Sequence, residues 1–236
     1  NTNQLNKSIE NFEKSIQINP KKFEAFNNLG NIYRDKQNIE LAIKYYLNSL
    51  EINPNYIIAL QNFGVCLQNF IFSEYSSVAE KHIIKLLQKN KILRPVDIVN
   101  TLIRFIYLNT EYNLTINNYE EEANKISLDE LINKFLKIVI LVNLLKITPI
   151  TDLQIEKVLK NLRSKLLLNI KSITNFNNAS KLMQLIAYQC YINEYIYPIN
   201  EKEKKALIKI EKKLEDLLKF NNFEKFILEI SCLAAY

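Results

Sequence analysis

The sequence predicts an all-α fold, on three observations. It has 2 glycines and 5 prolines among 236 residues, too few for the many tight turns of a β-sandwich or barrel. Leucine, isoleucine, lysine, glutamate and asparagine fill long stretches at helical spacing. Both glycines, Gly30 and Gly64, lie 34 positions apart in the similar strings NNLGNIY and QNFGVCL. We therefore expect helices throughout, with a 34-residue repeat near the N-terminus.

The repeat can be aligned position by position. Pro20 and Pro54 are also 34 positions apart, in the strings SIQINP and SLEINP. Between them, an aromatic, Leu-Gly and Tyr on a first helix are followed by Ala, an aromatic and Pro on a second, namely Phe26, Leu29, Gly30, Tyr33, Ala42, Tyr46 and Pro54. Small residues allow close helix approach, and we expect the aromatic residues to fill the space between neighbouring helix pairs. This pattern resembles the tetratricopeptide repeat, whose helix-turn-helix units stack into an α-solenoid.

Residues 1–72 are interpreted as three such repeats, the first truncated, the second complete and the third degenerate. Upstream, the match is limited to a second helix, carried by Ser8, Phe12, Ser15 and Pro20. We therefore expect further repeats before residue 1 in a longer parent protein. Downstream, a first helix is matched by Leu60, Phe63, Gly64 and Leu67. In the helix after it, Ser76 takes the alanine position and no proline follows at the expected place.

The rest of the chain predicts helices of another kind. Ser127 with Glu130, and Thr151 with Gln154, have the spacing of a capping box, in which side chains satisfy the free amides of a helix start. We expect helices at about 76–89, 96–108, 128–146, 152–169, 178–195, 201–219 and 223–235.

The predicted domain organisation follows from these helices. Residues 73–108 form transition helices after the repeats. The stretch 109–126 is polar and rich in Asn and Glu, which predicts a linker. Residues 127–236 are then a helical, bundle-like connector domain.

Composition excludes several function classes. Without other glycines, the chain cannot form a G-x-G-x-x-G turn or a phosphate-binding P-loop. His82 is the single histidine, so any nucleophilic triad would have to be built around it, and a histidine metal site would lack a second imidazole. It follows Lys81 on a charged helix, and we expect it at the surface. Cys66, Cys190 and Cys232 lie far apart in apolar contexts, which fits buried thiols and a cytoplasmic setting. We expect no catalytic residue, metal or cofactor within this chain.

Charge and hydropathy argue against a membrane span and favour no strong nucleic-acid site. The longest apolar run, 138–145, is much shorter than the ~20 residues of a membrane helix. The net charge of +6 is spread evenly along the chain. Two runs of basic residues without acidic residues stand out, at 81–94 and at 157–181. We interpret them as solvated helix faces and keep a basic nucleic-acid binder as the weaker alternative.

A polar groove is the best binding site that the repeats predict. First helices line the concave surface of such a solenoid, where equivalent residues form ladders. Asn28 and Asn62 are 34 apart, and an amide can both donate and accept a hydrogen bond with an extended peptide backbone. Further polar residues that could widen the groove are Asn27, Asn31, Arg34, Gln61 and Gln68. The alternative is that asparagine is simply common in this sequence.

A second informative stretch reads QCYINEYIY and contains Gln189, Asn193 and Glu194. Asn193 and Glu194 lie among aromatics on a helix expected to be mostly buried, where they need partners, so we expect a polar pair that ties two helices together rather than catalysis. The string also resembles a helix of bacterial proteins in which tetratricopeptide repeats and a helical connector precede an S-adenosylmethionine-dependent methyltransferase domain. The resemblance implies that any catalysis and any S-adenosylmethionine binding lie in an attached C-terminal domain, which this chain could contact.

The sequence thus predicts a region that binds a protein or peptide without catalysis and is connected to a methyltransferase. A freestanding adaptor or assembly scaffold is the alternative. Partner identity, oligomeric state and the number of upstream repeats do not follow from the sequence.

Overall fold

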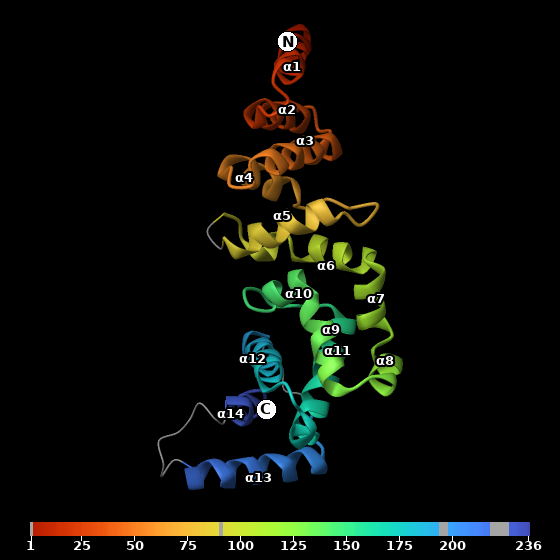
Figure 1. The fold of residues 1–236 in the computed structure, drawn as a ribbon, viewed down its shortest axis with the longest axis vertical. Coiled ribbons are helices and arrows are strands. Elements are labelled where there is room, and N and C mark those ends of the chain that lie inside the picture. Colours follow the sequence, from red (N-terminus) through yellow and green to blue (C-terminus); the bar gives the residue numbers. More distant parts are fainter. Residues whose placement is uncertain (1, 90–91, 194–197, 218–226) are drawn as a thin grey trace. The chain divides into compact units, whose positions relative to one another are not determined.

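The computed structural model describes residues 2–89, 92–193, 198–217 and 227–236 (Figure 1). In these residues all regular structure is helical, with 14 α-helices and no strand, which confirms the predicted all-α fold. The chain divides into two compact units, residues 1–105 and 106–236. Each unit is described by itself.

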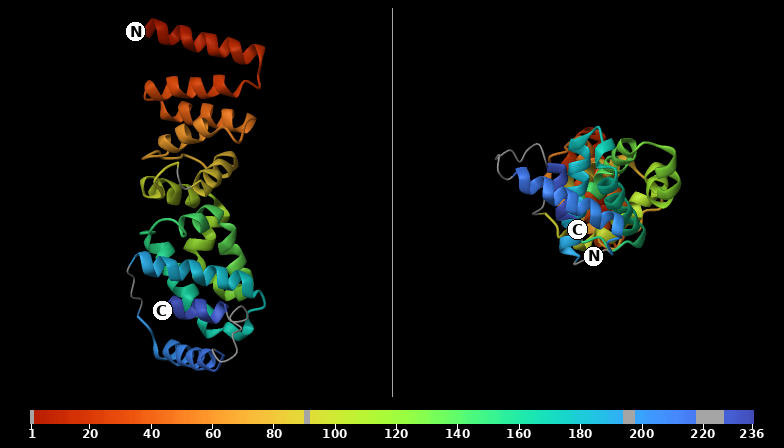
Figure 2. Two further views of the ribbon diagram at one scale, coloured as in Figure 1. Left: turned by 90° about the vertical axis from the view of Figure 1, so that its left-hand side faces the viewer. Right: turned by 90° about the horizontal axis from the view of Figure 1, so that it is seen from below.

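The first unit is built of helices that stack in chain order (Figure 2). They are α1 (Thr2–Ile18), α2 (Phe23–Asp35), α3 (Ile39–Ile52), α4 (Ile57–Cys66), α5 (Ser77–Gln88) and the start of α6 (Val99–Leu108). Each of α2, α3 and α4 packs on the helix before it and on the helix after it. A connection of three residues, 36–38, joins α2 to α3, and the side chain of Asn38 caps α3 by accepting from Leu41 N at 3.1 Å. This alternation of antiparallel neighbours is that of a helical-repeat solenoid.

The two glycines lie where paired helices come closest. A Cβ atom at Gly30 would lie 2.5 Å from Cε1 of Tyr46, so the tyrosine ring occupies the space that a larger residue would need. Ala42, on the same helix as Tyr46, is completely buried. Tyr46 therefore packs against Gly30 inside its own helix pair, whereas the repeat pattern led us to expect it in the space between neighbouring pairs. The ring of Tyr45, which the repeat pattern does not include, stacks on Tyr33 at 5.2 Å.

The third repeat differs from the sequence prediction in its register. The connection between α4 and α5 runs over 67–76, much longer than the connection 36–38 in the repeat before it. Ser76 is the N-cap of α5, with its hydroxyl accepting from Ala79 N at 3.2 Å, and does not take the alanine position. Ala79 is the completely buried alanine of α5. The longer connection displaces the small residue by three positions, which a fixed 34-residue period does not reveal.

The second unit is a bundle of eight α-helices among the described residues. They are α7 (Thr110–Asn117), α8 (Tyr119–Lys125), α9 (Leu128–Lys137), α10 (Val139–Leu144), α11 (Leu153–Leu168), α12 (Phe176–Ile192), α13 (Glu201–Leu217) and α14 (Ile227–Ala234). Both α11 and α12 pack on α14, and α12 also packs on α9. The core of this unit lies along these two long helices, whose inward faces carry completely buried residues such as Leu162 and Leu182.

The segment 109–126 is not the linker that its polar composition predicts. It forms α7 and α8, and Thr115, Ile116 and Tyr119 on these helices are buried. The side chain of Asn109 caps α7 by accepting from Tyr112 N at 3.1 Å. Most of the asparagine and glutamate side chains of this stretch are exposed while Thr115, Ile116 and Tyr119 face the interior, so polar composition alone was misleading.

Two further boundaries differ from those predicted. The helix expected over 128–146 is broken at Ile138 into α9 and α10. Ser127 caps α9 as predicted, accepting from Glu130 N at 3.2 Å. Thr151 does not cap α11, because Asp152 fills this role and accepts from Gln154 N and Ile155 N.

Candidate functional site

Four of the seven predicted groove residues form one hydrogen-bonded network between the first helices of successive repeats. Asn62 on α4 donates through Nδ2 to Oδ1 of Asn27 at 3.0 Å and to Oδ1 of Asn31 at 3.1 Å. Its Oδ1 accepts from Nη1 of Arg34 at 3.2 Å. Helical spacing places the three partners along one face of α2, so the network is a seam between α2 and α4.

Tyr46 belongs to the same network, although the sequence did not indicate it as a site residue. Its hydroxyl donates to Oδ1 of Asn31 at 2.8 Å, and burial raises the pKa of Tyr46 above its ordinary value. Asn31 therefore accepts two hydrogen bonds, one from each neighbouring helix. The signal that could have revealed Tyr46 is its repeat position opposite Gly30, which directs the hydroxyl across α2.

The other three predicted groove residues lie outside this network. Asn28 is half-buried, and Gln61 and Gln68 are exposed on or just after α4. Asn28 is the equivalent of Asn62 one repeat earlier, but the helix before it, α1, is a second helix and offers it no seam of the same kind. The expected ladder of Asn28 and Asn62 is thus formed by Asn62 with Asn27 and Asn31 instead.

The network determines which groups remain available to a ligand. Both Nδ2 hydrogens of Asn62 are used within the seam, so this amide positions its neighbours. The guanidinium of Arg34 has five N–H donors, and one of those on Nη1 is donated to Asn62. The side chain of Arg34 is 33% exposed. Nη2 of Arg34 also lies 3.7 Å from Asp35, a distance typical of a weak surface pair. The seam therefore presents the guanidinium of Arg34 in an orientation fixed by its hydrogen bond to Asn62.

Two polar residues of the stretch 189–193, Gln189 and Asn193, form a hydrogen-bonded pair within the second unit. Gln189 is buried and donates through Nε2 to the carbonyls of Leu145 at 2.8 Å and Thr148 at 2.9 Å. Its Oε1 accepts from Ile150 N at 3.1 Å, and Asn193 donates to that oxygen at the same distance. The pair ties α12 to the loop between α10 and α11. Glu194 lies outside the described residues.

His82 is completely buried, which corrects the expectation of a surface histidine. Its Nε2 lies 3.1 Å from Oε1 of Glu51 on α3, and Lys81 donates to the same oxygen at 3.1 Å. Desolvation lowers the pKa of His82, and the bonds from Lys81 and His82 lower the pKa of Glu51. The neutral imidazole thus links α5 to α3 and lacks the neighbours of a nucleophilic site.

Several residues of the two basic runs are engaged within the fold. Lys85 donates to Asn55 at 2.8 Å, and Arg94 forms a double contact with Asp97. In the second run, Lys157 pairs with Glu120 at 2.9 Å and Lys165 donates to the carbonyl of Ala123. The carboxylates paired with Arg94 and Lys157 reduce the positive potential that a nucleic-acid site would need.

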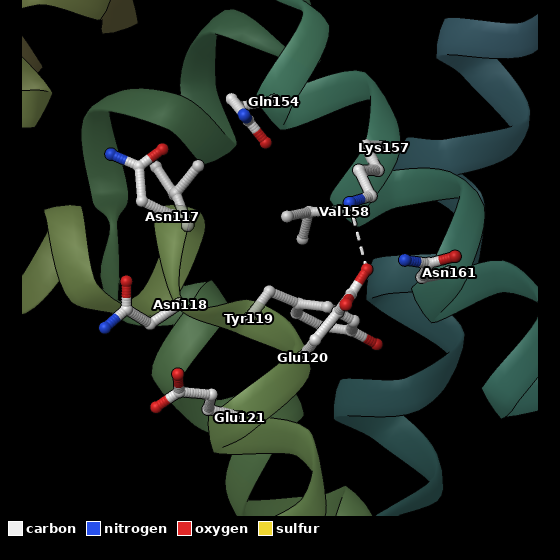
Figure 3. Close-up of a pocket in the computed structure, with 10 residues that line it drawn as sticks. Asn117, Asn118, Tyr119, Glu120, Glu121, Gln154, Lys157, Val158 and Asn161 are labelled. Atoms are coloured by element: carbon white, nitrogen blue, oxygen red, sulfur yellow. Dashed lines mark ion pairs between the residues drawn. The ribbon is translucent and has the colours of Figure 1, made fainter.

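A polar pocket of about 220 Å³ lies between α7, α8 and α11 (Figure 3). Its wall carries the ion pair between Lys157 and Glu120 and the amides of Asn117, Asn118, Gln154 and Asn161. Tyr119 also lines it, and its hydroxyl is a buried group without a hydrogen-bond partner in the described structure. Burial raises the pKa of Tyr119 to about 12.

Other chemistry is limited in the described part of the chain. There, no three His, Cys, Asp or Glu side chains gather as a metal site would require, and no helix is long and apolar enough to cross a membrane. Cys66 and Cys232 are buried and Cys190 is half-buried, as free thiols, and burial raises the pKa of each.

Comparison with protein families agrees with the helical repeats of the first unit. The tetratricopeptide repeat family matches residues 23–56, which hold α2 and α3, and a second TPR repeat family matches residues 2–33, which hold α1 and most of α2. The TPR models thus match residues 2–56, which hold α1, α2 and α3. No curated protein sequence and no solved structure matches it.

Proposed function

We propose that the repeats bind an extended segment of a partner protein, without catalysis, at the seam between α2 and α4. TPR repeats indicate a role in protein–protein interaction or as a scaffold. The observation that carries the finer proposal is the network in which Asn62 fixes Arg34. A guanidinium oriented in this way forms charge-assisted hydrogen bonds to a carboxylate or to backbone carbonyls of the ligand. Gln61, Gln68 and Asn28 flank the seam and supply further amides.

Peptide selection tests the groove directly. A displayed peptide library is selected on the chain, and the affinity of the selected peptides is then measured for Arg34→Ala. We expect a loss of about tenfold or more, as for truncation of a central arginine. Arg104→Ala is the matched control, because Arg104 is an exposed arginine on α6 of the same unit. Equal affinities for both variants contradict the proposed groove.

The link to a methyltransferase is a separate part of the proposal. It rests on the string 189–197, of which the described part fixes the α10–α11 loop through Gln189 and Asn193. In this proposal the second unit is a cytoplasmic connector that contacts an attached catalytic domain, and S-adenosylmethionine binds only there. Isothermal titration of S-adenosylmethionine against this chain and against the longer parent protein tests it.

Binding by the longer protein alone supports the connector proposal. Absence of binding by both leaves a freestanding adaptor or scaffold. A basic nucleic-acid binder instead predicts an affinity for oligonucleotides that falls steeply with salt, and the pairing of Lys81, Lys157 and Arg94 with carboxylates disfavours it.

A further inference from the structure

A large groove in the second unit is assigned to neither the repeats nor the polar pair on α12. It has a volume of about 650 Å³ and lies between the end of α11, the 3-10 turn Ile170–Ser172, the start of α12 and one face of α13, with Glu229 of α14 at its edge. Its floor is apolar and is formed by Leu167, Leu168, Ile170, Phe176, Ala206 and Ile210. Phe176 is 54% and Leu168 is 43% exposed, so substantial apolar surface faces water.

Lysines border this apolar floor. Lys202, Lys205, Lys209 and Lys213 follow one another at three or four residues along α13, so they share one face, and Lys171 lies across the groove on the 3-10 turn. Lys213 pairs with Glu229 at 2.8 Å. For the other four lysines, no carboxylate of the described residues lies within ion-pair distance. The row extends over about 16 Å, at the helical rise of 1.5 Å per residue.

The arrangement of the charges indicates the shape of the ligand. The ammonium groups are spread along the groove and do not converge on one point, as they would around a single phosphate. The apolar floor runs parallel to the row and is mainly aliphatic, which suits apolar side chains better than stacked bases. A helix with apolar residues on one face and carboxylates beside them matches both features at once.

We propose that this groove binds an acidic amphipathic helix of a partner protein. The helix lays its apolar face on Phe176, Leu168 and Ile210, and its flanking carboxylates face the lysines of α13. Burial of the apolar surface provides most of the affinity, whereas the exposed ion pairs mainly determine orientation and association rate. The groove is a second protein-binding surface, independent of the one proposed on the repeats.

The test measures binding of a labelled acidic amphipathic peptide to the whole chain by fluorescence anisotropy. The peptide is helical, about 16 residues long, with leucines at intervals of three and four and glutamates beside them. We expect Lys205→Glu with Lys209→Glu to weaken binding about tenfold or more. The matched control is Lys204→Glu with Lys212→Glu, which makes the same change of charge on exposed residues of α13 that do not line the groove. The control should retain affinity within about threefold.

A second variant tests the apolar floor. Phe176→Ser removes the most exposed apolar side chain of the groove and should also weaken binding, with the helical circular dichroism unchanged because Phe176 is largely outside the core. Equal losses in the groove and control variants overturn the proposal, since they would show attraction by net charge alone. It is also overturned if phosphatidylglycerol vesicles or oligo-dT bind in a groove-dependent manner and the peptide does not.

Discussion

The ring of Tyr46 makes position 30 intolerant of any side chain. Gly30→Ala would place a Cβ 2.5 Å from a ring carbon that is itself fixed by the bond to Asn31. Overpacking of this kind costs about 1–3 kcal/mol, which exceeds the gain of about 1 kcal/mol from the better helix propensity of alanine. We expect a net loss of stability, measured by urea unfolding.

Gly64→Ala provides the internal comparison for this prediction. Its Cβ would lie 3.1 Å from Cδ2 of Leu86, a flexible aliphatic end that can move. Here the propensity gain of about 1 kcal/mol should balance or outweigh the strain. Equal destabilisation by the two substitutions would show that the identity of the neighbouring atom is not what matters.

For the Tyr119 hydroxyl we predict that its removal increases stability. This buried group has no hydrogen-bond partner in the described structure. Leaving such a group unsatisfied costs about 1–3 kcal/mol, so Tyr119→Phe should raise the free energy of unfolding by about 1 kcal/mol. A rise in thermal midpoint would agree with this. A clear fall would mean that the hydroxyl has a partner, such as a bound water.

At the scale of whole elements, α12 depends on one side chain for its contact with the α10–α11 loop. Gln189→Leu removes the donor to the carbonyls of Leu145 and Thr148, each left buried at a cost of about 1–3 kcal/mol. Asn193→Ala should cost less, since Asn193 is half-buried and its bond to Ile150 is 3.3 Å long. Thermal unfolding of both variants checks this order, and the reverse order would contradict the role given to Gln189.

The contact between α3 and α5 should weaken in acid. His82 has a lowered pKa in the folded state, so the unfolded state binds its proton more readily. The stabilising contribution is complete above the unfolded pKa of about 6.5 and declines as the pH falls below it. The groups that affect His82 are Glu51, Lys81 and Lys85. Glu51 has a lowered pKa too and adds acid sensitivity in a lower range, below about pH 4.5.

Thermal midpoints measured between about pH 8 and pH 5 check the contribution of the histidine. His82→Gln is the informative variant, because its amide can still donate to Glu51 but does not titrate. We expect it to flatten the pH dependence in this range. An unchanged profile would assign the acid sensitivity to other groups.

These elements also show how far sequence reasoning reaches. Helices and the complete repeat could be predicted because Gly30, Ala42 and Tyr46 act through contacts inside one period. The register of α5 could not be predicted, because the amino-acid composition does not reveal the length of the connection that precedes this helix. His82 was misplaced because its partner, Glu51, belongs to the preceding repeat. For the same reason, Asn62 was predicted as a residue of the peptide groove in a ladder with Asn28, and its bonds to Asn27 and Asn31 were not foreseen.

At the scale of the molecule, the chain comprises two compact units. We expect a destabilising substitution in one unit to leave amide hydrogen exchange in the other unit unchanged. Gly30→Ala should increase amide hydrogen exchange within residues 1–105, and Gln189→Leu should do so within 106–236. Mass spectrometry of peptides from both units measures this, and increased exchange throughout the chain in either variant would contradict the division.

The seam between α2 and α4 also depends on the order of the repeats. Its bonds join Asn62 to residues 31 and 35 positions earlier, so they exist only when the correct repeat follows the correct one. A repeat from elsewhere, lacking the asparagine, would leave the buried amide of Asn27 without its donor. The side chains of this seam thus make the order of the repeats specific, and an array with shuffled repeats would lose these hydrogen bonds.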